Sequence, residues 1–148
     1  MLGAFEATGE TLWLDRAGRI LGFFTKQIAP KNGWRLPEHY HEDWQVNPNY
    51  SGNPMSRPAG CTPGHSLELS QLILQHYDLS GRTDAMALSR ARRLLMQAFN
   101  DAWLPDGGLA YTTRPDGSID IADRYLWPVT EAIRVLATLQ KLDQTQEL

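Results

Sequence analysis

The chain has 148 residues, a net charge of −3, 42% hydrophobic residues and 21% charged residues. This composition is typical of a folded globular domain and excludes an intrinsically disordered chain. The absence of a basic excess argues against a nucleic-acid-binding protein, and no apolar run reaches the roughly 18 residues of a membrane span.

Cysteine usage and the N-terminal residues point to a cytoplasmic protein. Cys61 is the single cysteine, so neither an internal disulfide nor a cysteine-based zinc site is expected. The N-terminus shows no basic segment followed by an apolar stretch, and no signal peptide is predicted.

The spacing of apolar residues and the positions of turn residues predict five helices. In chain order they cover residues 2–8, 11–27, 65–78, 84–103 and 128–141. Between the last two, residues 109–122 are expected to form a β-hairpin around a turn at Pro115, Asp116 and Gly117. The sequence therefore predicts helical pairs joined by short turns on one side and by longer connections on the other.

Residues 29–64 are expected to form a long proline-rich loop. Six of the nine prolines lie in this segment, which shows no sustained helical period. Loops of this length inside a domain are usually functional or disordered. The aromatic residues Trp34, Tyr40, Trp44 and Tyr50 have surface to bury, which argues against disorder. We expect a loop that faces a substrate, with Trp44 as its anchor.

The densest group of chemically useful residues is Thr62-Pro63-Gly64-His65-Ser66-Leu67-Glu68. Proline and glycine place His65 at a helix N-terminus, with Glu68 one turn further on the same face. A helix N-terminus lowers the pKa of an imidazole and favours its neutral form, which a general base needs. The alternative is structural: His65 caps the helix and Glu68 complements its dipole.

A second helix start has the same organisation. In Tyr125-Leu126-Trp127-Pro128-Val129-Thr130-Glu131, an aromatic ring stands at the start of the helix and a carboxylate lies one turn into it. The Trp127 ring could pack against sugar C–H groups, and Glu131 could accept hydrogen bonds from hydroxyls. The alternative is a core tryptophan with a glutamate at a helix start. We expect the His65 and Trp127 helix starts to open on the same side.

No metal site, phosphate loop or serine hydrolase is predicted. His39 and His41 lie among carboxylates, but the spacing fixes no third ligand, so this segment is expected to face a substrate instead. The glycines match neither a phosphate-binding loop nor a dinucleotide fingerprint, and no Gly-x-Ser-x-Gly motif occurs. His76, late on its helix, is expected at the surface.

Taken together, these motifs resemble the N-acylglucosamine 2-epimerase family, most closely its mannose isomerase branch. The resemblance extends over nearly the whole chain. In order, the matching stretches are Glu38-His39-Tyr40 with Trp44, Pro48-Asn49-Tyr50, Arg57-Pro58, Thr62 to Glu68, Ala102-Trp103, Asp106 to Thr112, and Asp123 to Ala132.

The resemblance implies an all-α fold built from helical hairpins of an (α/α)6 toroid. It also implies a reaction that moves a proton at the sugar carbon beside the carbonyl, with no cofactor. His65 matches a catalytic histidine of the family. The remaining candidates are expected to bind the sugar: Glu68, Glu131, Trp127, Arg57, Trp44 and His39. Arg57 only lies near a family arginine, because Met55 stands close to the matching position, and Leu69 stands where many members have tryptophan.

The resemblance covers the middle of the family's chains and extends toward their C-terminal part. Residues 1–148 are therefore expected to be a single, incomplete toroid domain. Helices missing from such a toroid would leave apolar faces uncovered and favour association with other copies.

The sequence thus predicts a sugar isomerase or 2-epimerase that uses His65 as its acid–base group. Two alternatives stay open. One is an inactive remnant that only binds sugar or partner chains. The other is a glycoside hydrolase on the same kind of toroid, with Glu68 and Glu131 as opposed carboxylates.

Overall fold

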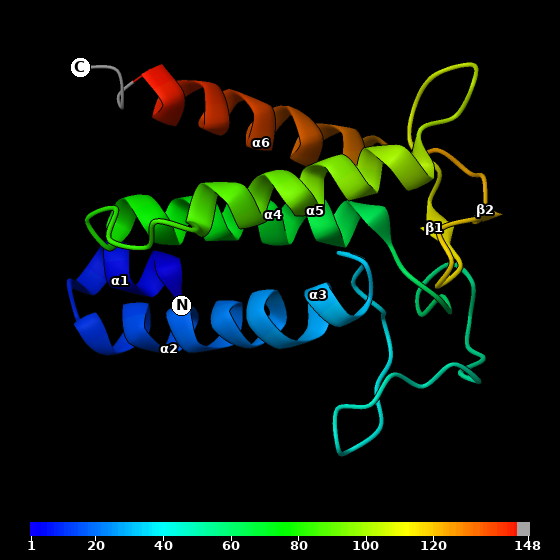
Figure 1. Ribbon diagram of the computed structural model, residues 1–148, viewed down its shortest axis with the longest axis horizontal. Coiled ribbons are helices and arrows are strands. Elements are labelled where there is room, and N and C mark those ends of the chain that lie inside the picture. The colour runs from blue at the N-terminus through cyan, green and yellow to red at the C-terminus, as the bar shows by residue number, and fades with distance from the viewer. Residues whose placement is uncertain (145–148) are drawn as a thin grey trace.

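The computed structural model describes residues 1–144, which form a mostly helical fold with one small two-stranded sheet. The helices are α1 (Leu2–Thr8), α2 (Thr11–Phe23), the π-helical turn η1 (Phe24–Ile28), α3 (Ala29–Lys31), α4 (Pro63–Leu79), α5 (Ala87–Ala102) and α6 (Leu126–Gln144). The strands are β1 (Thr112–Thr113) and β2 (Ile119–Ile121). The long helices lie side by side, and the long loop and the hairpin gather at one end of them (Figure 1).

The five predicted helices and the predicted hairpin are confirmed, with shifted boundaries. The second helix does not stop near residue 27, because it passes through η1 into α3 and ends at Lys31. Pro30 has no N–H to donate to the carbonyl four residues earlier, so one α-helical hydrogen bond is missing there. The π-helical turn η1 lies directly before this position and lets the helix continue. The long loop consequently starts after Lys31, and α4 begins at Pro63, two residues earlier than predicted.

Helix α4 is the centre of the core, since it packs against α5, α6 and α2. Leu67 and Leu74 on α4, Leu94 on α5 and Val135 on α6 are fully buried. Between α4 and α5, the buried Ser70 hydroxyl donates a 2.9 Å hydrogen bond to the Ala91 carbonyl. The start of α4 is thus held on a well-packed helix.

Some apolar residues of the predicted helices are exposed. Ile20, Leu72 and Met86 have exposed side chains, although their spacing matched the apolar face of a helix. Ile20 and Leu72 line a groove between α1, α2 and α4, and a second apolar groove containing Met96 and Leu136 lies between α5 and α6. Nothing among residues 1–144 packs over these two grooves.

The long loop is held at both ends. At its start, Arg35 donates to both carboxylate oxygens of Asp101 on α5, at 2.7 and 2.9 Å. Further along, the Trp44 ring packs edge-on against Phe23 and Phe24, with ring centroids 4.9 and 6.3 Å away. Trp44 is therefore the anchor that was predicted, although its side chain remains about half exposed.

At its other end the loop is joined to the hairpin by backbone hydrogen bonds. The Cys61 N–H donates to the Thr113 carbonyl and the Thr113 N–H donates to the Cys61 carbonyl, both at 2.9 Å. Pro37 is bridged to Cys61 from the other side. The loop, the start of α4 and the hairpin therefore form one connected layer at the end of the helices.

Across residues 1–144, none of the helices has both the length and the apolar composition that crossing a bilayer requires.

Candidate functional site

The start of α4 presents His65 beside a carboxylate from the long loop. Thr62 is the N-cap residue and Pro63 opens the helix, so His65 lies in the first turn. The Nδ1 atom of His65 lies 2.9 Å from Oε1 of Glu38, and the Thr62 N–H donates to the same oxygen at 3.1 Å. The His65 side chain is 48% exposed, whereas that of Glu38 is 15% exposed. A largely buried carboxylate thus holds a half-exposed imidazole.

The contact with Glu38 reverses the expected protonation behaviour of His65. The helix N-terminus was expected to lower its pKa, but the hydrogen bond to the Glu38 carboxylate raises the pKa of His65 above its ordinary value. Desolvation opposes this effect, and the charges of Glu38 and Glu68 add to it. The carboxylate contact outweighs the helix dipole because it is a direct, partly desolvated interaction with the ring.

The raised pKa predicts a pH-dependent contribution of His65 to stability. Its stabilisation should be fully present below the pKa of a histidine in the unfolded chain, about 6.5. It should then be lost as the pH rises through the higher pKa of the folded state. His65→Gln should therefore destabilise the chain more at about pH 5 than at about pH 8 in urea unfolding. His41→Gln, in the exposed part of the loop, is the control, and an equal cost at both pH values would contradict the prediction.

Trp127, at the start of α6, lies beside the His65 ring. The His65 and Trp127 rings are 5.3 Å apart between centroids and inclined by 36°. The expectation that the two helix starts open on the same side is therefore confirmed. Trp127 also packs directly on Gly64, where an added Cβ would collide with its six-membered ring. The backbone of α4 and the indole are thus in close contact.

This close contact predicts a cost for Gly64→Ala. The new methyl group should push Trp127 out of place and destabilise the chain by about 1–3 kcal/mol, as expected for overpacking. Gly22→Ala is the matched control, because Gly22 is also helical and no atom lies within 4 Å of its Cβ position. That variant should gain about 0.5–1 kcal/mol from helix propensity. Urea unfolding of both variants measures the difference, and equal stabilities would refute the packing argument.

The two candidate carboxylates, Glu68 and Glu131, differ in their surroundings. Glu68 is exposed, one turn along α4 from His65. Glu131 is 17% exposed and forms an ion pair with Arg134 on its own helix, with Nη1 2.9 Å from Oε1. Over residues 1–144, no hydrogen bond joins Glu131 to His65 or Trp127.

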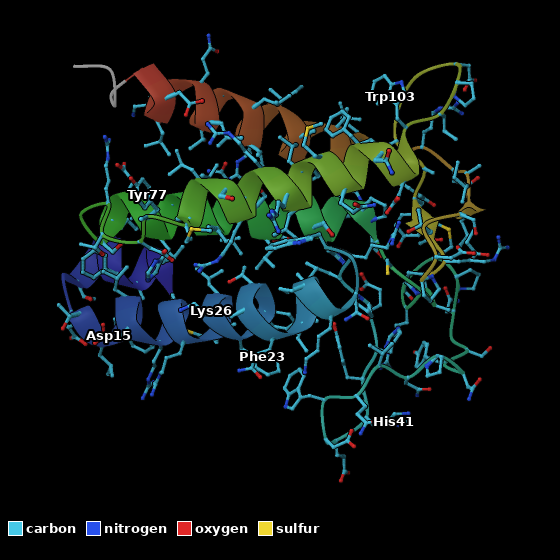
Figure 2. All side chains as sticks on the ribbon, in the orientation of Figure 1. Asp15, Phe23, Lys26, His41, Tyr77 and Trp103 are labelled. Atoms are coloured by element: carbon cyan, nitrogen blue, oxygen red, sulfur yellow. The ribbon has the colours of Figure 1, made fainter. Side chains whose placement is uncertain are left out.

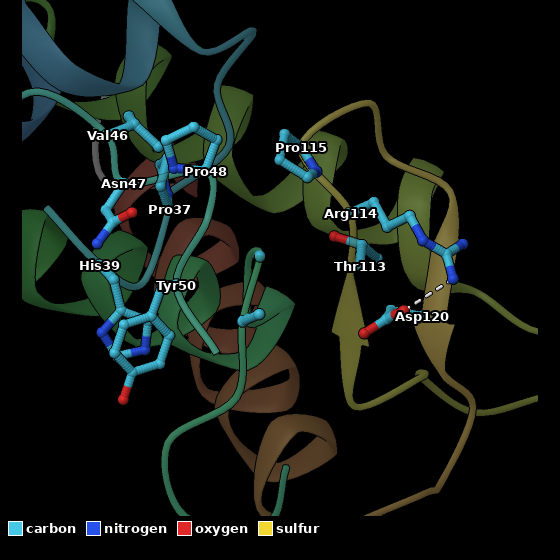
Figure 3. Close-up of a pocket in the computed structure, with 12 residues that line it drawn as sticks. Pro37, His39, Val46, Asn47, Pro48, Tyr50, Thr113, Arg114, Pro115 and Asp120 are labelled. Carbon is cyan, nitrogen blue, oxygen red and sulfur yellow. Dashed lines mark ion pairs between the residues drawn. The ribbon is translucent and has the colours of Figure 1, made fainter. Parts of the chain in front are cut away.

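His39 and Arg57 belong to a separate cluster around Tyr50. The His39 ring stacks on the Tyr50 ring, with centroids 3.3 Å apart, and its Nε2 lies 2.9 Å from the Pro58 carbonyl oxygen. The guanidinium carbon of Arg57 lies over the Tyr50 ring, 6.0 Å from its centroid. His39 and Tyr50 line a cavity of about 250 Å³ between the loop and the hairpin (Figure 3). An ion pair between Arg114 and Asp120, drawn as a dashed line, closes the hairpin side.

The remaining histidines and the cysteine have separate places. His41 lies on the part of the loop that projects away from the helices (Figure 2). His76 was predicted to lie at the surface, but it is partly buried, and its Nε2 lies 3.2 Å from the Leu14 carbonyl oxygen. Burial raises the pKa of the Cys61 thiol to about 12, so it stays neutral. Within the part of the chain that the structure describes, no three His, Cys, Asp or Glu residues are placed to hold a metal ion.

Sequence reasoning missed the role of Glu38 and of two tyrosines near the site. Glu38 entered as one of the carboxylates around His39 and His41 and in a stretch that matches the family, with no role of its own, although it contacts His65 across 27 positions. The Tyr111 hydroxyl donates to the Met55 carbonyl, and the Tyr125 hydroxyl lies 3.0 Å from the Met55 sulfur. No local spacing predicts such contacts, because they depend on the path of the loop.

Known proteins are similar to this chain in sequence and in fold. A family model described as N-acylglucosamine 2-epimerase (GlcNAc 2-epimerase) matches residues 1–147. A D-mannose isomerase from Thermobifida fusca is 36% identical over 143 residues, which cover 93% of this chain and 35% of that protein. A D-mannose isomerase from Marinomonas mediterranea is 33% identical over 147 residues, covering 95% and 36%.

A crystal structure of D-mannose isomerase superposes with a TM-score of 0.87 at 32% sequence identity. The matched region covers 95% of this chain and 37% of that one. The chain thus spans little more than a third of the length of the relatives it matches.

Proposed function

The chain belongs to the N-acylglucosamine 2-epimerase family, and we propose that it supplies part of the active site of a sugar isomerase or 2-epimerase. The observation that carries this proposal is the pairing of His65 with Trp127 at two adjacent helix starts. A free aldose is the proposed substrate. The names of the relatives favour mannose, whose isomerisation gives the corresponding ketose.

The proposed reaction transfers a proton beside the sugar carbonyl. Nε2 of His65 removes the proton from C2 of the open-chain sugar, and the electron pair moves onto the carbonyl oxygen to form an enediolate. Transfer of the O2 hydroxyl proton to O1 and return of a proton to C1 give the ketose, whereas return of the proton to the opposite face of C2 restores the C1 carbonyl and gives the epimer. Donors near the developing oxyanion lower the barrier, and no cofactor is needed.

Trp127 and the carboxylates are proposed to hold the sugar for this step. The exposed part of the Trp127 ring offers an apolar face to sugar C–H groups, next to the His65 imidazole. Glu68 is one turn from His65 and free to accept hydroxyl hydrogen bonds. Glu131 is proposed to reach the sugar from its pair with Arg134, and His39, Trp44 and Arg57 to contact it from the loop.

The helices are proposed to be one part of an (α/α)6 toroid, with residues 1–148 in a single domain. The resemblance to D-mannose isomerase over the matched region and the two uncovered apolar grooves between helices support this proposal. The long loop, residues 32–62, would then lie on the side of the toroid where the site opens. Association of copies through the grooves is a further expectation.

A chimeric enzyme tests the proposed function directly. The matching third of the Thermobifida fusca D-mannose isomerase is replaced by residues 1–147 of this chain, and the chimera is assayed with mannose in D2O. Ketose formation, together with deuterium at the carbon beside the carbonyl, supports the proposal. A folded chimera that neither isomerises the sugar nor exchanges this proton contradicts it, and release of a cleaved sugar from a glycoside would indicate a hydrolase instead.

A further inference from the structure

We infer that Glu38 is a positioning residue that keeps the proton of neutral His65 on Nδ1 and leaves Nε2 free to face the substrate. This inference rests on the proposed function for its purpose. Its evidence is a contact between two residues 27 positions apart, which places a loop carboxylate behind the ring of the proposed base.

Glu38 is held in place by the backbone around it. Its N–H donates to the Gly60 carbonyl at 2.9 Å, and the preceding Pro37 is bridged to Cys61. Cys61 is joined in turn to Thr113 of the hairpin by two 2.9 Å hydrogen bonds. The carboxylate therefore projects from a layer formed by three segments of the chain.

The hydrogen bonds of Glu38 determine which nitrogen of His65 is protonated. Oε1 of Glu38 accepts from the Thr62 N–H, and an ionised carboxylate can only accept. Nδ1 of His65, 2.9 Å from the same oxygen, must therefore be the donor. In the neutral ring the other nitrogen, Nε2, then carries the lone pair, and it has no hydrogen-bond partner among residues 1–144.

The same carboxylate is placed to stabilise the product of proton abstraction. When Nε2 takes a proton from the sugar, the ring becomes an imidazolium cation and Glu38 remains an anion. The other charge acting on the ring is Glu68, on α4 itself, whereas α6 contributes the neutral Trp127 ring. Glu38 is the charged group that is both in direct contact with the ring and largely buried, so it should dominate.

Two substitutions separate the charge of Glu38 from its hydrogen bonds. Glu38→Gln keeps an oxygen that can accept from Nδ1 and from Thr62, but it removes the negative charge. Glu38→Ala removes both. Glu42→Gln is the matched control, because Glu42 carries the same charge on an exposed position of the same loop.

The test is an NMR titration of the imidazole nitrogens in the 15N-labelled 148-residue chain, with His65 assigned by its loss in His65→Gln. In the unsubstituted chain the neutral His65 ring should carry its proton on Nδ1. Glu38→Gln should lower the pKa of His65 and retain this tautomer, whereas Glu38→Ala should lower the pKa and lose the tautomer preference. Glu42→Gln should change neither.

A neutral His65 ring protonated on Nε2 in the unsubstituted chain would overturn the inference. This measurement of the tautomer requires no substitution at Glu38. A His65 pKa that Glu38→Gln leaves unchanged would overturn it as well. The titration contains no sugar, so its outcome is independent of whether the chimera isomerises mannose. Failure of the inference and failure of the proposed function can therefore be told apart.

Discussion

His65→Ala in the chimeric enzyme should lower kcat/KM for mannose by about 10²- to 10⁴-fold, the usual contribution of a positioned general base. The loss is expected because no other histidine among residues 1–144 lies at a helix start beside Trp127: His39 and His41 are in the loop, and His76 is bonded to the Leu14 carbonyl. Deuterium exchange at C2 should fall in parallel, since both measurements report removal of the same proton.

The control for this loss is His41→Ala, in the exposed part of the loop. This variant should change kcat/KM by no more than about twofold, far less than the loss expected when a general base is removed. The chain by itself should show little turnover, because the His65 side chain is 48% exposed and a site open to water lacks the preorganised surroundings that stabilise an enediolate. Full activity of the His65→Ala chimera, or rapid isomerisation by the 148-residue chain alone, would show that the acid–base group has been wrongly assigned.

Gly60→Ala should destabilise the chain by about 3 kcal/mol, combining a left-handed backbone with a steric clash. Gly60 has φ +76°, and an added Cβ would collide with the Thr113 carbonyl oxygen of the hairpin. Relief of that collision requires the loop and the hairpin to separate. Because the Gly60 carbonyl accepts the Glu38 N–H, the variant should also lower the pKa of His65 by disturbing its carboxylate partner.

The matched control is Gly81→Ala, since Gly81 has φ +73° but no atom within 4 Å of its Cβ position. That variant should lose only the cost of the left-handed conformation, about 1–2 kcal/mol. Urea unfolding measures both stabilities, and NMR titration follows His65. If Gly60→Ala is no more costly than Gly81→Ala, the contact between loop and hairpin is not the constraint described above.

The sequence by itself predicted the elements whose signals are local. The spacing of apolar residues and the turn residues located all five predicted helices, and the Pro115–Gly117 turn located the hairpin. Proline and glycine before His65 were enough to place it in the first turn of a helix, and Pro128 placed Trp127 at the start of another. These features depend on residues within one or two turns of each other, so a single sequence contains the information.

Only the tertiary structure decided what those elements meet. The helical spacing of Ile20 and Leu72 places each of them on an apolar helix face, but it could not show that these side chains stay exposed. The helix dipole, a local effect, predicted a lowered pKa for His65, but the Glu38 carboxylate raises it from across the long loop. That contact depends on backbone hydrogen bonds that join the loop to the hairpin through Cys61. Contacts between distant residues are fixed by the packing of the whole chain, because no local spacing rule constrains the path of a loop.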